Sequence, residues 1–313
     1  MSTVLVLGAT GFVGRALVAA LSDLGIDVRP ASRRLTKPSP PWVACDLENP
    51  ETIGPALDDV TCAYYLVHSM GAADYRAIDR RCAENFVRAA EHSGCERIVY
   101  LGGVAPRGEP SEHLASRLEV GEILRGGRVP ALELRASMII GNGSASWRII
   151  RDLAARLPFM ILPKWLESRT CPIALPDVIT ALLAARELPL EASAWFDLPG
   201  PDVLTVREML MTVAALQGRR IPAVRVPLLS PALSALWLRL VTGEDFHLGR
   251  ELVLGLREDL LPKDARYWEL VGRGPAWSFV DAATEALATE RGPSPIARFV
   301  ERIVHRIGPH ASS

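Results

Sequence analysis

The fold is decided by a stretch close to the amino terminus, Val4-Leu5-Val6-Leu7-Gly8-Ala9-Thr10-Gly11-Phe12-Val13-Gly14. Its short apolar run stops at a glycine, which is typical of a buried parallel strand. The apolar residues that follow recur at helical spacing as far as Leu24, and Gly25 stands where a helix commonly ends. The stretch therefore predicts a strand, a tight glycine turn and a helix, in that order.

The spacing of the three glycines favours dinucleotide binding. Gly8 permits the tight turn, Gly11 lets backbone N–H groups approach a pyrophosphate, and Gly14 lets the helix pack on the strand. A helix N-terminus also stabilises the negative charge of a pyrophosphate. The expected cofactor contacts in this turn are Gly8, Thr10, Gly11, Phe12, Val13 and Gly14.

The rest of the first half alternates short apolar runs with helical patterns. Further strands are predicted at residues 26–31, 43–45, 63–67, 97–101 and 131–135, with helices at 74–93 and 111–125. Alternating strands and helices imply a parallel sheet with both faces covered. We therefore predict an α/β fold, a Rossmann doubly wound sheet with helices on both faces.

Beyond Gly141 the pattern loosens, because prolines break the chain into short pieces. We predict an NAD(P)-binding domain at 1–141, whose late strands return within about 170–200. Residues 142–313 are predicted to form a small, mostly helical substrate domain interleaved with the sheet, ending in a polar tail at 305–313. The helices expected there lie at 177–186, 205–217 and 231–241.

Composition excludes several classes of protein. The chain has 35 Lys+Arg and 36 Asp+Glu, a net charge of −1 that argues against nucleic-acid binding. Its five cysteines form no CxxC pair, so we expect no metal site, reduced thiols and a cytoplasmic location. No run of apolar residues is long enough for a transmembrane segment. The expected partner is a small-molecule substrate, and a homodimer remains open.

The end of the second strand bears on the choice of cofactor. Ala31-Ser32-Arg33-Arg34 contains no acidic residue for a ribose 2′-hydroxyl, and it offers guanidinium groups to a 2′-phosphate. This favours NADP(H) over NAD(H), unless one or both arginines, Arg34 first, lie in solvent. Asp46 is expected either to accept a bond from the adenine amino group, with Leu47 against the ring, or to cap a helix.

The chain resembles the short-chain dehydrogenase/reductase superfamily, in its extended and atypical branches. The resemblance covers at least residues 3–218 and is closest to the NAD(P)-binding, nucleoside-diphosphate-sugar-epimerase-like subgroup. The matching segments are Gly8-x-x-Gly11-x-x-Gly14, Asp46-Leu47, and residues 64–69, 97–103, 134–141, 172–173, 177–178, 199–202 and 204–205.

The resemblance implies a Ser or Thr after the fifth strand and a Tyr-x-x-x-Lys pair on the next helix. This chain has Gly102-Gly103 at the first place, and His113 and Arg117 at the second. In one interpretation His113 is a general acid with a pKa near 6.5, while Arg117 orients the ribose and lowers that pKa. In the other, the catalytic pair is lost and His113 is only a polar residue near the cofactor.

Other candidates follow the predicted strands. Val67 and His68 are expected near the cofactor, at the carboxyl edge where open α/β sheets bind ligands. Weaker substrate candidates are Ser69, Ser137, Asn142 and Trp147, although Ser137 is also suited to bonding local backbone.

The apolar segment 226–241 fits core packing, a lid, a dimer face or a membrane-surface helix, but it lacks the basic face of the last. We expect an NADP(H)-dependent oxidoreductase acting on a small, rather apolar carbonyl or enone. The alternative is a non-catalytic NADPH-binding redox sensor or assembly factor. Nucleotide-sugar chemistry is disfavoured, since the second domain offers few diphosphate ligands beyond Arg148, Arg151 and Arg169.

Overall fold

The computed structural model describes most of the chain. The described residues are 3–35, 41–69, 74–156, 160–162, 164–220, 223–225 and 258–290. The apolar segment 226–241, with the helix expected at 231–241, and the polar tail 305–313 lie outside them.

A seven-stranded sheet forms the centre of the molecule, and all of its strand pairs are parallel. The strand order is β11-β6-β5-β4-β1-β2-β3. This is the order of a doubly wound sheet, so the predicted fold class is confirmed. The bounds are β1 Thr3–Leu7, β2 Val28–Ser32, β3 Val43–Ala44, β4 Val60–Tyr65, β5 Arg97–Gly103, β6 Ala131–Ala136 and β11 Ala194–Asp197.

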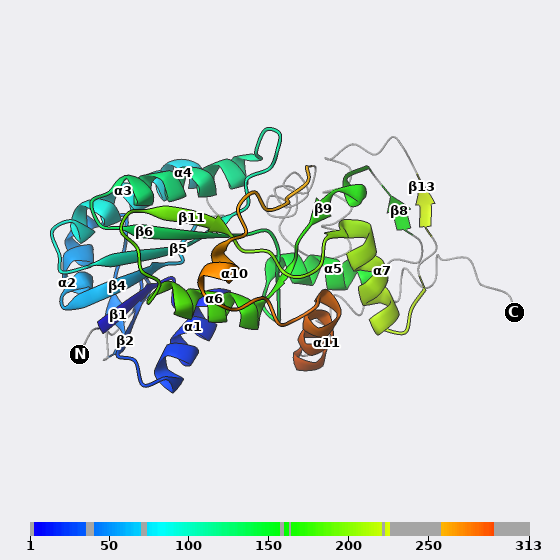
Figure 1. Cartoon of the computed structure of the whole chain (residues 1–313), viewed down its shortest axis with the longest axis horizontal. Coiled ribbons are helices and arrows are strands. Elements are labelled where there is room, and N and C mark those ends of the chain that lie inside the picture. Colours follow the sequence, from blue (N-terminus) through cyan, green and yellow to red (C-terminus); the bar gives the residue numbers. More distant parts are fainter. Residues whose placement is uncertain are drawn as a thin grey trace, which may run out of the picture.

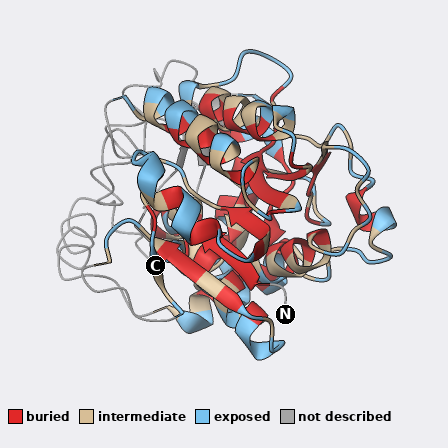
Figure 2. Cartoon of the chain, turned by 90° about the vertical axis from the view of Figure 1, so that its left-hand side faces the viewer, coloured by how far each residue is buried: buried red, intermediate tan, exposed pale blue. Residues whose placement is uncertain are grey.

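Helices cover both faces of this sheet (Figure 1). On one face, α1 (Phe12–Asp23) packs beside α6 (Leu175–Ala185). On the other, α3 (Tyr75–Ala90) packs beside α4 (Glu112–Gly126), with α2 (Ile53–Leu57) next to α3. The strands between them are almost wholly buried (Figure 2). Their largely apolar composition agrees with this, because a strand buried on both faces has no solvent-facing side, and the charged residues of β6 are paired.

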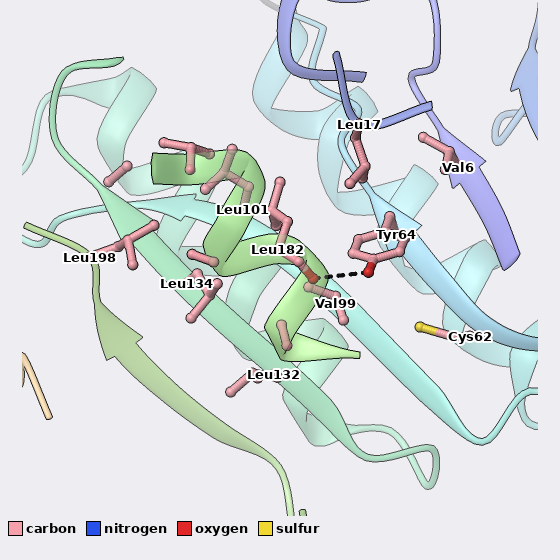
Figure 3. Packing of buried hydrophobic residues seen from close by; sticks show 14 of the residues in the cluster. Val6, Leu17, Cys62, Tyr64, Val99, Leu101, Leu132, Leu134, Leu182 and Leu198 are labelled. Carbon is pink, nitrogen blue, oxygen red and sulfur yellow. Dashed lines mark hydrogen bonds between the residues drawn. The ribbon is translucent and has the colours of Figure 1, made fainter. Parts of the chain in front are cut away.

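Both tyrosines at the end of β4 belong to the core. Tyr64 is fully buried against the α1 and α6 face, and its hydroxyl donates to the Leu182 carbonyl at 2.9 Å (Figure 3). Tyr65 is buried on the opposite face, against Phe86 and Tyr100. Alternation along the strand thus sends one ring to each face.

A second group of helices lies beyond one end of the sheet (Figure 1). It consists of α5 (Ala145–Arg156), α7 (Val206–Leu216) and α11 (Phe279–Thr289), which share a hydrophobic cluster around Trp147 and Met209. Thr205 and Ser278 start α7 and α11 with capping boxes to Glu208 and Asp281. The sequence did not predict α5, which lies just beyond Gly141, where the apolar pattern begins to loosen.

The remaining elements are short. Two-stranded pairs join β7 (Ile139–Ile140) to β10 (Ile173–Ala174), β9 (Arg169–Thr170) to β12 (Leu204–Thr205), and β8 (Met160–Leu162) to β13 (Ala223–Arg225). The other elements are η1 (Pro50–Thr52), η2 (Lys164–Glu167) and α10 (Tyr267–Leu270). Among the described residues, none of the helices has the length and apolarity needed to span a membrane.

Candidate functional site

A cavity of about 350 Å³ lies at the carboxyl edge of the sheet. One wall is the glycine turn between β1 and α1. A second wall carries the polar side chains His68, His113 and Arg117. The third wall is apolar and comes largely from the second group of helices: Met138, Ile149, Ile150, Leu153, Val206 and Leu260. The cavity thus joins the expected cofactor turn to a polar centre and an apolar end.

The glycine turn fits a pyrophosphate for steric reasons. Gly8 has a φ of 78°, and a Cβ on it would lie 2.5 Å from the Leu66 carbonyl oxygen. Gly11 is the N-cap of α1 and makes no side-chain hydrogen bond to the backbone N–H groups of the first turn. Phe12, Val13 and Gly14 of that turn line the cavity, whereas Thr10 is exposed and does not.

Arg33 and Arg34 lie beyond the carboxyl end of β2, and both are exposed. They stand outside the cavity wall, next to Ser32, whose hydroxyl accepts the Arg34 backbone N–H at 3.3 Å. No acidic residue occupies the end of this strand. A 2′-phosphate bound here would lie beside the two exposed guanidinium groups.

Asp46 does not cap the helix that follows it, so that alternative is wrong. The N-cap of η1 is Asn49, whose side chain accepts the Glu51 N–H, while Asp46 accepts the Glu48 N–H at 3.1 Å. The cap falls at Asn49 because Pro50 provides the preset φ of a first helical position. Leu47 is buried in the core.

His113 and Arg117 lie one turn apart on α4 and both face the cavity. Ser111 caps this helix by accepting the Leu114 N–H. The Arg117 guanidinium donates to the Leu101 carbonyl at 2.6 Å, which fixes it at the end of β5. A Cβ on Gly103 would lie 3.2 Å from the end of the Leu114 side chain and 3.5 Å from the Arg117 side chain, so bare backbone faces these two side chains.

The electrostatics of the site keep both histidines neutral. Desolvation, followed by the charges of Arg117 and His68, lowers the pKa of His113 to about 3. Desolvation and then Arg117 also lower the pKa of His68, but its side chain is exposed, so the lowering there is the smaller of the two. The ordinary pKa near 6.5, on which the general-acid interpretation of His113 depends, therefore does not hold here. Each ring is suited to donating one N–H rather than to carrying a positive charge.

The remaining candidates are only partly brought together. Val67, His68 and Ser137 line the cavity, and the Ser137 hydroxyl donates to the Cys171 carbonyl at 2.9 Å. Ser69, Asn142 and Trp147 do not line it. Asn142 donates to the Thr289 carbonyl, and the fully buried Trp147 donates to Glu290. These two side chains fasten the end of α11 onto α5.

The sequence analysis missed two parts of the site. Asp79 is buried near the polar wall, where it accepts the Ser69 N–H and the Ser116 hydroxyl. The sequence feature that marks Asp79 is its position four residues after Tyr75, which places a carboxylate on the apolar face of α3. The apolar wall that α5 contributes was not predicted, although Ile150, Leu153 and Ala154 recur at helical spacing.

Comparison with known proteins agrees with this architecture. The sequence model described as "NAD dependent epimerase/dehydratase family" matches residues 4–123. Ceramide reductase of Caulobacter vibrioides is 29% identical over 283 residues, covering 84% of this chain and 86% of that protein. The chain is thus similar to the NAD-dependent epimerase/dehydratase family over residues 4–123 and to this reductase over most of its length. The family and the named relatives indicate an NAD(P)-dependent enzyme of the oxidoreductase type.

Solved structures share the fold of this chain. UDP-N-acetylglucosamine 4-epimerase from Bacillus cereus aligns with a TM-score of 0.69 at 15% identity, over 95% of this chain and 99% of that one. A short-chain dehydrogenase/reductase superfamily protein from Agrobacterium tumefaciens with bound NAD aligns with a TM-score of 0.66 at 20% identity, over 97% of this chain and 99% of that one. In the parts of the chain that the structure describes, no three His, Cys, Asp or Glu residues gather as metal ligands.

Proposed function

We propose that this protein is an NADP(H)-dependent oxidoreductase that acts on the carbonyl or enone group of a small, rather apolar substrate. The observation that carries the proposal is the cavity, which runs from the glycine turn past His113 and Arg117 to an apolar wall. We further propose that residues 1–141 bind the cofactor, while residues 142–313 contribute most of the substrate side.

The cofactor preference rests on Arg33 and Arg34. Their guanidinium groups are exposed after β2, with no carboxylate at the end of that strand. Charge-assisted hydrogen bonds to a 2′-phosphate are worth about 1.5–3 kcal/mol each, whereas a 2′-hydroxyl offers them no charge. This difference favours NADP(H).

The chemistry rests on the polar wall. When bound, the reduced nicotinamide supplies a hydride to the carbonyl carbon, the π electron pair moves to the oxygen, and a proton from water completes the hydroxyl. The neutral His113 ring donates an N–H to that oxygen as negative charge develops on it. Arg117, fixed on the Leu101 carbonyl, adds positive charge beside the same place.

The substrate class rests on the apolar wall. Apart from Arg117, no formally charged side chain lines the cavity among the described residues, since both histidines are neutral. Desolvating a charged group against the apolar wall would be costly, whereas an alkyl group gains from burial there. The name of the Caulobacter relative agrees with this, because a ceramide is a lipid with long alkyl chains.

A paired titration tests the proposal. The purified full chain is titrated with NADPH and with NADH, following nicotinamide fluorescence, and is then supplied with NADPH and a series of aldehydes and methyl ketones. We expect NADPH to bind at least about tenfold more tightly, a difference of ~1.4 kcal/mol, and to be oxidised by the longer-chain carbonyls. NADPH binding without turnover of any carbonyl would instead favour the non-catalytic sensor.

A further inference from the structure

Two histidines from separate elements face each other across the cavity. His68 lies in the segment after β4, and His113 lies in the first turn of α4. Their ring centroids are 6.5 Å apart and their planes are inclined by 73°. Both rings line the cavity together with Arg117. They are 45 residues apart in the sequence, so only the fold brings them together.

The separation of the rings suits a single oxygen atom between them. A hydrogen bond of about 2.8–3.0 Å from a ring nitrogen places the acceptor oxygen about 4 Å from the ring centroid. Twice that distance exceeds the 6.5 Å between the centroids, so one oxygen can accept from both rings at a bent angle. An oxygen with two lone pairs, such as a carbonyl or alkoxide oxygen, matches this arrangement.

Two other donors in this part of the cavity have protein acceptors. Arg117 Nη2 donates to the Leu101 carbonyl, and the Ser137 hydroxyl donates to the Cys171 carbonyl. Gly103 offers no side chain here. His68 is a further donor that an oxygen near His113 can reach, beside the other N–H groups of Arg117, and its neutral ring has one N–H to give.

A buried carboxylate ties together the two segments that carry these rings. Asp79 Oδ1 accepts the Ser69 backbone N–H at 2.8 Å, and Oδ2 accepts the Ser116 hydroxyl at 3.1 Å. Ser69 directly follows His68, and Ser116 lies three residues after His113. Asp79 and Ser116 are 5% and 1% exposed, so water does not compete for these bonds.

We propose that His68 is a second catalytic residue, that His68 and His113 together donate N–H groups to the substrate oxygen, and that Asp79 is the positioning residue that sets their separation. This inference rests on the proposed carbonyl chemistry. The pair replaces the missing hydroxyl of the family, because two preorganised donors stabilise the charge that develops on the oxygen. Neither ring needs to be protonated for this role.

The test uses decanoate as a probe, because its carboxylate oxygen resembles the developing alkoxide and its tail suits the apolar wall. Ring-nitrogen chemical shifts of histidine-labelled full chain are followed during the titration. We expect the signals of His68 and His113 to move together along one binding curve. We expect His68→Asn and His113→Asn each to weaken decanoate binding at least about tenfold. His92→Asn, at an exposed helix end, is the matched control.

The positioning role of Asp79 is tested by substitutions that should affect both histidine rings at once. Asp79→Asn keeps an acceptor for the Ser69 N–H but reverses the bond to Ser116, and Ser116→Ala removes only that bond. We expect both variants to lower kcat for a carbonyl substrate more than they change KM, and to alter the ring shifts of both histidines.

Several results would overturn the inference. Unmoved His68 ring signals, unchanged decanoate affinity in His68→Asn, or no binding to the wild-type protein at millimolar decanoate would each do so. Failure of the proposed function gives a different pattern: decanoate engages both rings, but no carbonyl is reduced. Circular dichroism of each variant shows whether it has folded.

Discussion

Glu133 Oε1 occupies the space beside Gly102, since a Cβ on this glycine would lie 2.6 Å from it. A Cβ on Gly121, in the facing helix α4, would lie 2.5 Å from the same atom. The carboxylate is fully buried and accepts hydrogen bonds from Arg125 and Arg135. The two glycines thus make room for a buried ion network beneath the cavity.

This network predicts unequal effects of substitution at the two neighbouring glycines. We expect Gly102→Ala to lower the free energy of unfolding by about 3 kcal/mol or more, because displacing Glu133 separates a buried charge from its partners. Gly103→Ala is the matched control and should cost about 1 kcal/mol, since its nearest neighbour is the end of the Leu114 side chain at 3.2 Å. Urea unfolding measures both, and equal costs would contradict the steric argument.

Arg33 is predicted to select the phosphorylated cofactor. Arg33→Ala should raise the Kd for NADPH about tenfold, equivalent to ~1.4 kcal/mol, and leave the Kd for NADH unchanged. Arg34→Ala should have a smaller effect. Arg128→Ala, an exposed arginine before β6, is the control. Parallel losses of both cofactors would show that Arg33 supports the fold instead of reading a phosphate.

Arg117 is predicted to lower the pKa of His113 without being the main cause. Arg117→Met should therefore raise the pKa of His113 above about 3 yet leave it below 6.5, because desolvation is the larger cause. Ring-nitrogen titration by NMR measures the change, with His92 as an internal reference. A pKa that returns fully to 6.5 would mean that charge, not burial, controls the site.

The two cavity histidines should make stability depend on pH. In the unfolded chain they bind protons near pH 6.5, whereas in the folded chain the pKa of the half-buried His113 is about 3 and that of the exposed His68 is lowered less. Between these values the unfolded state holds more protons, so stability falls as the pH drops from 6.5 towards 4. Asp79, whose pKa burial raises, acts in the opposite direction.

Urea unfolding across that pH range measures the effect. The double variant His68→Asn, His113→Asn should lose stability less steeply on acidification than the wild-type protein. An identical slope in both proteins would show that the histidines keep their ordinary pKa values in the folded state.

The apolar wall should set the length of alkyl chain that the cavity accepts. Ile149→Phe adds volume to this wall, so it should reduce kcat/KM for long-chain carbonyls at least about tenfold while sparing short ones. Met211→Phe, on the exposed side of α7, is the control. A uniform loss for all chain lengths would place the alkyl group elsewhere.

The sequence by itself determined the nucleotide-binding architecture. Gly8, Gly11 and Gly14 act through backbone sterics within a few residues, and the apolar runs of β1, β4 and β5 report burial directly. Such features depend on neighbours in the chain, so pattern and spacing predict them. Strand ends were less well predicted, since Leu66 and Val67 continue the apolar run but leave the sheet to line the cavity.

Only the tertiary structure decided the chemistry around that architecture. It placed His68 opposite His113, filled the space beside Gly102 with Glu133, and turned Asn142 and Trp147 away from the cavity. It also made both histidines neutral. The physical reason is that packing, desolvation and charge coupling depend on residues far apart in the chain, and no local pattern records which of them become neighbours.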